Sequence, residues 1–160
     1  MSLPEVIAFF DGLADEWDED LIYDDEILGA ILDGAQVGPG DRVLDVACGT
    51  GILTPYLLAR DVAEVVGVDV APRMIQHAAT KYDDPRARFL NADILTAQLY
   101  GQFNRIVVYN SFPHFAKPGE LVNSLVARLA PSGFLTVAHG QSREAINARH
   151  ESAARHVSIP

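Results

Sequence analysis

A stretch around Asp45 limits the fold of this chain more than any other part of the sequence. Residues 43–46 form a short apolar run that only Asp45 interrupts, a pattern typical of a buried parallel strand. Gly49 and Gly51 follow, and two glycines permit a tight turn and leave no side chain between the backbone and a ligand. A helical pattern begins directly afterwards, at Ile52. This order of strand, glycine turn and helix predicts an open α/β sheet that binds a ligand at a helix N-terminus.

Two later segments repeat the pattern of an apolar strand that ends in an aspartate. Residues 64–68 lead into Asp69, and residues 87–92 lead into Asp93. Asp45, Asp69 and Asp93 are evenly spaced along the sequence. Because successive βα units bring strand ends to one edge of a parallel sheet, we expect the three carboxylates to lie along that edge. A carboxylate at the end of the second strand can accept hydrogen bonds from both hydroxyls of a ribose.

Three motifs, at residues 43–51, at 66–69 with 72–75, and at 91–94, are supported by two weaker ones at 104–108 and 129–135. Through them the sequence resembles the class I S-adenosylmethionine-dependent methyltransferases. The resemblance implies an α/β fold, a three-layer Rossmann-like sandwich whose mainly parallel sheet has the strand order 3-2-1-4-5. Strands 6 and 7 of that family are expected to be absent. The chain is then either a truncated fragment or a protein that completes its sheet by association.

The resemblance also implies S-adenosyl-L-methionine as the cofactor. Gly49 and Gly51 would let the backbone approach the methionyl part, and Asp45 would place negative charge near its amine. Asp69 would hold the ribose, and Asp93 would accept a hydrogen bond from the adenine amino group. The full set of expected cofactor-binding residues is Asp45, Ala47, Gly49, Gly51, Asp69, Val70, Met74, Asp93, Ile94 and Asn110.

The expected function is methyl transfer from this cofactor to a small-molecule acceptor. Such a displacement needs mainly proximity and orientation, and a base is required only when the acceptor must lose a proton. His114 and His139 follow the fourth and fifth strands and are the candidate catalytic residues. Each of them can equally be a surface or hydrogen-bonded histidine. The histidines have no local ligand spacing, so no metal site is predicted.

Composition excludes several classes of partner. The net charge of −10 argues against nucleic acid as a substrate, because an acidic surface repels phosphates. The longest apolar runs have the length of strands, so no membrane partner is expected. A single cysteine, Cys48, excludes an internal disulfide and fits a reducing compartment. We therefore expect a cytoplasmic protein.

The length of 160 residues favours one domain, and we divide it into three parts. An N-terminal helical lid is expected over residues 1–36, the core sheet over 37–140 and a C-terminal helix over 141–160. Residues 3–17 have an amphipathic pattern, which fits either a lid over the cofactor or a helix packed on the sheet. The acidic residues of 15–20 are expected to form a solvated turn.

The sequence leaves two alternatives to this function and also predicts a homodimer. The chain could be a cofactor-binding or partner-dependent module without activity of its own. An NAD-dependent oxidoreductase is disfavoured, because Thr54 stands where the third glycine of its fingerprint belongs. The expected fifth strand, residues 134–138, would be an apolar sheet edge, and such edges attract pairing from another chain. We therefore expect a homodimer through this strand or through the C-terminal helix.

Overall fold

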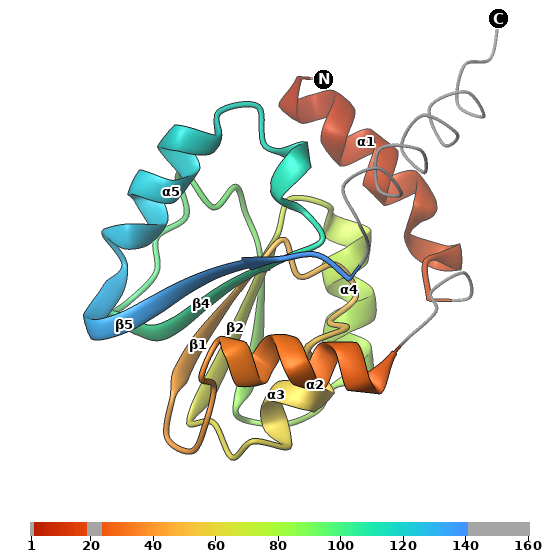
Figure 1. Cartoon of the computed structure of the whole chain (residues 1–160). Coiled ribbons are helices and arrows are strands. Elements are labelled where there is room, and N and C mark those ends of the chain that lie inside the picture. The colour runs from red at the N-terminus through yellow and green to blue at the C-terminus, as the bar shows by residue number, and fades with distance from the viewer. Residues whose placement is uncertain (1, 19–23, 141–160) are drawn as a thin grey trace, which may run out of the picture.

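The computed structural model describes residues 2–18 and 24–140, which form a single five-stranded sheet with helices around it (Figure 1). Neighbouring strands are all parallel, and their order is β3-β2-β1-β4-β5. The predicted α/β fold and strand order are therefore confirmed. The strands are β1 (Arg42–Val46), β2 (Glu64–Asp69), β3 (Ala87–Asn91), β4 (Phe103–Tyr109) and β5 (Leu129–Ala138).

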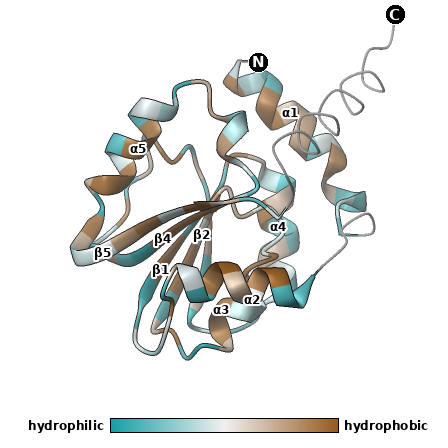
Figure 2. Ribbon diagram, viewed as in Figure 1, coloured by the Kyte–Doolittle hydropathy of each residue, from teal (hydrophilic) through white to brown (hydrophobic). Residues whose placement is uncertain are grey.

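Helices cover both faces of this sheet. α2 and α3 pack on one face, which contains Val43 and Val107, and α5 packs on the opposite face, which contains Leu44. Both faces of β1 are thus buried, which explains why its residues from Val43 to Val46 are apolar apart from Asp45 (Figure 2). The helices are α1 (Leu3–Leu13), α2 (Asp25–Gly34), α3 (Thr54–Leu58), α4 (Pro72–Lys81) and α5 (Pro118–Val126), with short 3-10 helices η1 (Ala14–Glu16) and η2 (Phe112–His114).

Local side-chain caps fix where the first two helices begin. α1 starts with a capping box, in which the Ser2 hydroxyl accepts from the Glu5 N–H and the Glu5 carboxylate accepts from the Ser2 N–H. α2 starts after Asp24, whose carboxylate accepts from the backbone N–H groups of Glu26 and Ile27. These caps satisfy amide groups that a helix N-terminus leaves without intrahelical partners.

β5 is longer than the expected strand 134–138, because it already begins at Leu129. Its pairing with β4 shifts register near its start, where Ser132 has a left-handed φ of 63°. A Cβ at Gly133 would lie 2.9 Å from the carbonyl oxygen of Ala130, so only glycine fits there. Pro131, Ser132 and Gly133 therefore form an irregularity inside the strand.

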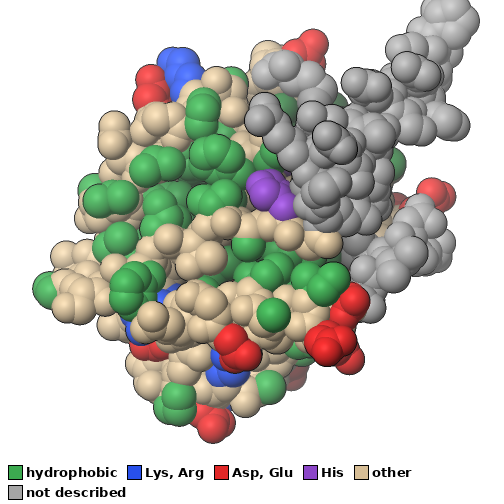
Figure 3. Space-filling view, viewed as in Figure 1, with side chains coloured by type: hydrophobic (Ala, Val, Ile, Leu, Met, Phe, Trp, Pro, Cys, Tyr) green, Lys and Arg blue, Asp and Glu red, His purple; other side chains and the backbone are tan. Residues whose placement is uncertain are grey.

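The last strand lies at the edge of the described sheet and is apolar. The side chains of Phe134 and Val137 are 45% and 42% exposed, and that of Val126 on α5 is 52% exposed. Hydrophobic side chains gather around β5 and α5 on the face of the molecule drawn in Figure 3. The apolar edge that the sequence predicts is therefore present.

Three further predictions concern the C-terminal segment, membrane-spanning helices and metal sites. The C-terminal helix expected at 141–160 lies outside the described residues. No helix within the described ranges is long and apolar enough to cross a membrane. Among the same residues, no cluster of histidine, cysteine, aspartate and glutamate could hold a metal ion.

Candidate cofactor-binding site

The carboxyl ends of β1, β2, β3 and β4 open into a cavity of about 490 Å³. Its floor includes residues at or just after these strand ends, and α1 and Trp17 line the opposite side. We call the segment from the start of α1 to Asp18 the roof. This volume lies within the range of small-molecule sites, and the position is the usual ligand crevice of an open α/β sheet. The cavity is the candidate site.

The two glycines of the turn after β1 have different surroundings. Gly49 borders the cavity, and Gly51 packs against other residues. A Cβ at Gly49 would meet only the indole nitrogen of Trp17, at 3.9 Å, so the backbone there is open toward the cavity. A Cβ at Gly51 would lie 2.9 Å from the Tyr82 ring and 3.1 Å from Thr54 Oγ1. Gly51 does not line the cavity, unlike the other expected cofactor-binding residues. Its glycine is required by packing and by a φ of 82°.

Asp69 at the end of β2 is held in place by the backbone around it. Its Oδ2 accepts from the Gly49 N–H and its Oδ1 accepts from the Ala71 N–H, both at 2.9 Å. Burial raises the pKa of Asp69, although these hydrogen bonds oppose the rise. Because each carboxylate oxygen has a second lone pair, Asp69 can still accept two hydroxyl groups from a ligand.

Asp45 in β1 is the most deeply buried acid of the site, with 2% of its surface exposed. Its Oδ2 has no hydrogen-bond partner among the described residues. Burial, and then the charge of Asp69, raise the pKa of Asp45 to about 8. A buried carboxyl without a partner is costly unless a donor or a cation meets it. Asp45 therefore suits a ligand that carries a positive group.

The remaining expected residues line the cavity from the later strand ends. Asp93 accepts from the Leu95 N–H through Oδ1, at 3.0 Å, in the turn after β3. Asn110 follows β4 with a left-handed φ of 57°, and its Oδ1 accepts from the Gly140 N–H at 2.8 Å. Met74 at the start of α4 provides a buried apolar wall. The cavity thus offers acidic groups along one edge and apolar contacts between them.

The two candidate catalytic histidines are placed differently. His114 in η2 lines the cavity, and its ring stands edge-on to that of Phe10, with 4.9 Å between ring centroids. His139, directly after β5, does not line the cavity. Of the two, only His114 is therefore in a position to act on a ligand there.

An apolar cluster and ring contacts hold the roof. Phe10 and Trp17 pack against Ala14, Ala71 and Met74. The Phe10 and Trp17 rings meet edge-to-face with centroids 5.9 Å apart. These contacts connect the end of α1 and η1 to the start of α4, so the roof rests on the same helix that follows the Asp69 strand.

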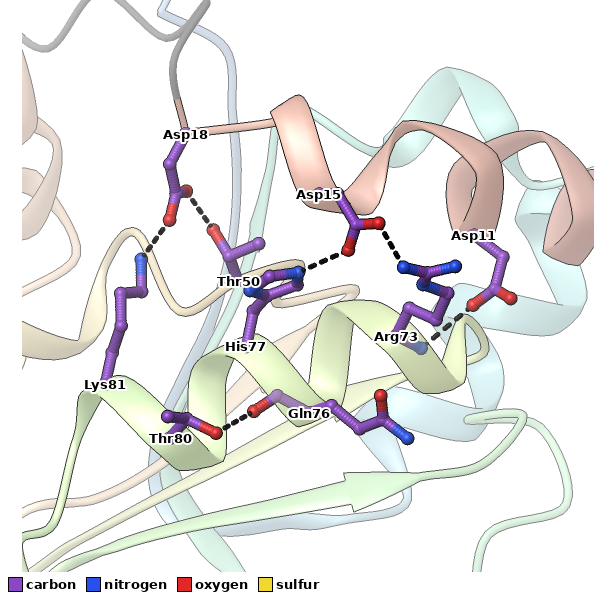
Figure 4. Close-up of polar contacts among 9 residues, drawn as sticks. All are labelled: Asp11, Asp15, Asp18, Thr50, Arg73, Gln76, His77, Thr80 and Lys81. Carbon is purple, nitrogen blue, oxygen red and sulfur yellow. Dashed lines mark hydrogen bonds and ion pairs between the residues drawn. The ribbon is translucent and has the colours of Figure 1, made fainter.

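Aspartates of the roof form polar contacts with α4 and the glycine turn (Figure 4). Asp18 accepts from Thr50 Oγ1 at 2.5 Å and from Lys81 Nζ at 2.7 Å. Thr50 lies between the two glycines and is fully buried. This contact therefore joins the roof directly to the turn that borders the cavity.

A second group of contacts lies one helical turn earlier. Asp15 pairs with Arg73 and with His77, the latter at 3.0 Å between Nε2 and Oδ1 (Figure 4). Asp11 accepts from the Arg73 N–H at 2.8 Å, and it thereby caps α4, which has no side-chain cap of its own. Asp15 is exposed, as expected for a solvated acidic turn, but Asp15 and Asp18 also bind partners distant in sequence, which the expectation did not include. Their sequence pattern carries no signal for those partners.

A family model described as a methyltransferase domain matches residues 43–133, which are more than half of the sequence. The chain belongs to this family. The predicted class I S-adenosylmethionine-dependent methyltransferase family is therefore confirmed, and the predicted cofactor with it. The matched region of the methyltransferase domain extends from β1 into β5 and includes all three strand-end aspartates.

Two curated relatives of this methyltransferase domain are named as O-methyltransferases. Malonyl-[acyl-carrier protein] O-methyltransferase of Acetivibrio thermocellus is 34% identical over 121 residues, which are 73% of this chain and 42% of the relative. A ubiquinone biosynthesis O-methyltransferase of Xanthomonas campestris is 30% identical over 101 residues, 61% of this chain and 42% of the relative. The chain spans less than half the length of either relative.

A solved structure agrees with the fold of the methyltransferase domain. The complex of DhpI with SAM and HEP superposes with a TM-score of 0.72 at 22% identity, over 99% of this chain and 72% of that chain. At this level of identity the agreement concerns the fold alone. The fold described above is therefore shared with that SAM-bound protein.

Proposed function

We propose that the chain binds S-adenosylmethionine in the cavity and transfers its methyl group to a small molecule. One observation carries the proposal: Asp45, Asp69 and Asp93 line the same cavity, beside the open backbone of Gly49. A row of carboxylates fits a ligand with an amine, a sulfonium and a ribose. The absence of cations from this part of the described cavity also makes a phosphate-bearing dinucleotide a poor fit.

Each of these residues would contact a different part of the cofactor. Asp69 would accept from the ribose hydroxyls with the lone pairs that the backbone leaves free. Asp93 would accept from the adenine amino group, between the apolar walls Met74 and Ile94. Asp45 would pair with the amine of the methionyl part, which favours its ionised form. Ala47, Val70 and Asn110 complete the lining.

The chain contributes position and exclusion of water more than reactive groups. When bound, the cofactor supplies a methyl carbon on a positively charged sulfur, and the C–S bond breaks with its electron pair staying on the sulfur. The strand-end residues would hold the bound cofactor beside the acceptor, and α1 would keep water away. When the acceptor is a hydroxyl, His114 takes its proton.

The acceptor class follows from charge and from the relatives. A net charge of −10 disfavours nucleic acid, as the sequence already suggests. The two relatives above are O-methyltransferases by name, which supports an oxygen acceptor. A partner-dependent module is the second candidate, because the apolar edge strand β5 leaves Phe134 and Val137 exposed.

Calorimetry with S-adenosylhomocysteine, together with methyl transfer from labelled S-adenosylmethionine, tests the proposal. Gly49→Val should abolish binding, because a side chain there meets the cavity at a left-handed φ of 56°. Gly119→Val is the matched control, since a Cβ at that position has open space. Binding without turnover by the wild-type chain would favour the partner-dependent module. Unchanged binding by a folded Gly49→Val variant would overturn the site.

A further inference from the structure

The cavity continues beyond the proposed cofactor contacts toward the N-terminal end of α1. Trp17, at the other end of the roof, lies over Gly49, whereas the first turns of α1 lie on the side of η2 and α5 (Figure 1). The continuation, which we name the outer compartment, is lined by Leu3, Val6, Phe9, Ser111, Phe115 and Lys117. None of these residues has a role in the proposed cofactor site.

Among the described residues, none buries the apolar face of α1 completely. Leu3, Val6, Phe10 and Leu13 recur at helical spacing and all line the cavity. No residue of α1 is buried, although the helix is amphipathic. An apolar helix face normally packs on a core, and burial of such surface is favourable. This face is therefore suited to an apolar ligand.

The charges around the cavity disfavour an anionic ligand. Among the described lining residues, the carboxylates are Asp45, Asp69, Asp93 and Glu120, and Lys117 is the only lysine or arginine. Lys117 pairs with Glu120 at 3.4 Å, and the two side chains are 69% and 61% exposed. Sequestering a carboxylate requires a cation and several donors nearby. The single lysine of the outer compartment, Lys117, is exposed and already paired, and Ser111 offers a single side-chain hydroxyl.

One polar group of the outer compartment has unused capacity. Ser111 is 7% exposed, and its Oγ has no hydrogen-bond partner among the described residues. The His114 N–H donates to the Ser111 carbonyl at 2.9 Å, so both side chains belong to one turn after β4. A buried hydroxyl without a partner is unfavourable unless a ligand supplies one. Ser111 thus marks where the polar end of an apolar ligand can bind.

We propose that the outer compartment binds the methyl acceptor, and that this acceptor is an uncharged, mainly apolar molecule with one hydroxyl group held by Ser111. The proposal rests on the proposed methyl transfer and adds the class of substrate. It distinguishes this chain from its malonyl-named relative, since a malonyl group presents a carboxylate. Ser111 and the apolar face of α1 are then the determinants of specificity.

The reaction on such an acceptor is balanced by groups already described. The hydroxyl oxygen forms a bond to the methyl carbon while the C–S bond breaks and leaves its electron pair on sulfur. The hydroxyl proton passes to His114, and the product is a methyl ether. Ser111 holds the acceptor oxygen and takes no part in the proton transfer.

The first test measures binding to the full 160-residue chain saturated with S-adenosylhomocysteine. The probes are 4-propylphenol and 3-(4-hydroxyphenyl)propanoate, which share a phenol and differ in the charge of the chain end. We expect the uncharged probe to bind at least about tenfold more tightly, because no interior cation compensates the carboxylate. Equal or tighter binding of the anion, or no binding of either probe, overturns the proposal. Failure of S-adenosylhomocysteine to bind would instead overturn the proposed function.

The second test adds a charge to the roof. Val6→Lys should weaken 4-propylphenol and bring the affinity of the propanoate to or above it, with the affinity for S-adenosylhomocysteine unchanged. Val126→Lys is the matched control, because Val126 is 52% exposed and outside the cavity. An unchanged preference in a folded Val6→Lys variant contradicts the assignment of the outer compartment.

The third test isolates the Ser111 hydroxyl. Ser111→Ala should weaken 4-propylphenol about two- to tenfold, the effect of one hydrogen bond, and leave propylbenzene unchanged. A purely structural role of Ser111 would change both probes alike. Equal effects on the two ligands, or none on either, would show that Ser111 does not bind the acceptor hydroxyl.

Discussion

Thr50 and Asp18 are joined by a hydrogen bond of 2.5 Å between the buried threonine hydroxyl and the aspartate carboxylate. Thr50 stands between the two glycines of the turn after β1, and Asp18 ends the described part of the roof. The same carboxylate binds Lys81 at the end of α4. One side chain therefore connects the roof, the glycine turn and α4.

Thr50→Val should loosen the roof and leave the fold intact, because valine keeps the shape and removes the donor. We expect S-adenosylhomocysteine to dissociate about fivefold faster, in line with the loss of one hydrogen bond of about 1 kcal/mol. Stopped-flow displacement measures the rate. Thr80→Val is the control, since among the described residues the Thr80 hydroxyl donates to the Gln76 carbonyl of its own helix (Figure 4). Equal rates in the two variants would show that the contact does not hold the roof.

The fluorescence of Trp17 should report on ligand binding. Its indole nitrogen is buried, has no partner among the described residues and faces Gly49 at the cavity. Addition of S-adenosylhomocysteine should therefore shift the emission of this residue, the single tryptophan of the sequence. An unshifted spectrum, together with unchanged affinity after removal of residues 1–18, would favour a helix that only packs.

Asp69→Ala should weaken cofactor binding about a hundredfold. Loss of two charge-assisted hydrogen bonds to the ribose costs about 2–4 kcal/mol of binding free energy. Calorimetry on S-adenosylmethionine measures the change, and Asp83→Ala is the control, because Asp83 is exposed on the surface. An affinity like that of the wild type in a folded Asp69→Ala variant would remove Asp69 from the ribose site.

Asp45 should make the stability of the free chain depend on pH. Its pKa is raised from 3.8 to about 8, so between these values the folded state keeps a proton that the unfolded state has lost. The stabilisation is fully present below the unfolded pKa and is lost as pH rises, with a slope of at most about 1.4 kcal/mol per pH unit. Urea denaturation from pH 5 to 8 should show this fall in the wild type and a smaller one in Asp45→Asn.

Asp45 should also couple cofactor binding to proton release. An amine that pairs with the ionised carboxylate lowers its pKa, so binding near pH 7 should release close to one proton. Calorimetry of S-adenosylhomocysteine in two buffers with different ionisation enthalpies counts the protons released. Proton release that is identical in Asp45→Asn would place the linkage on another group.

The apolar edge of β5 should pair with a second copy of the chain, which stays a prediction. Phe134 and Val137 are exposed on this edge, and exposed apolar edges attract further strands. Sedimentation across a dilution series should show a concentration-dependent dimer, and Val137→Lys should abolish it. A monomeric wild-type chain at high concentration would rule out this assembly.

The sheet and the row of strand-end aspartates could be predicted because their signals are local. An apolar run, a glycine turn and a helical pattern lie within about ten residues around Asp45, and the same period recurs at Asp69 and Asp93. Parallel βα units leave few ways to order such strands. The family motifs lie in the same segments, so fold, family and cofactor all follow from residues adjacent in sequence.

The roles of the acidic residues in the roof required the tertiary structure. Asp15 and Asp18 look like solvent-facing residues in sequence, and their partners Arg73 and Lys81 lie some sixty positions away. The sequence pattern of neither segment predicts that the two segments are in contact. The contacts exist because α1 and η1 pack along α4.

The two glycines and the two histidines likewise depend partly on local sequence and partly on tertiary packing. The sequence determined that Gly49 and Gly51 form a tight turn, but packing decided that the first borders the cavity and the second contacts Tyr82. Likewise His114 and His139 both follow strands, yet only the turn after β4 brings its histidine to the cavity. Neighbouring residues set the local backbone conformation, whereas the direction of a side chain depends on the elements packed around it.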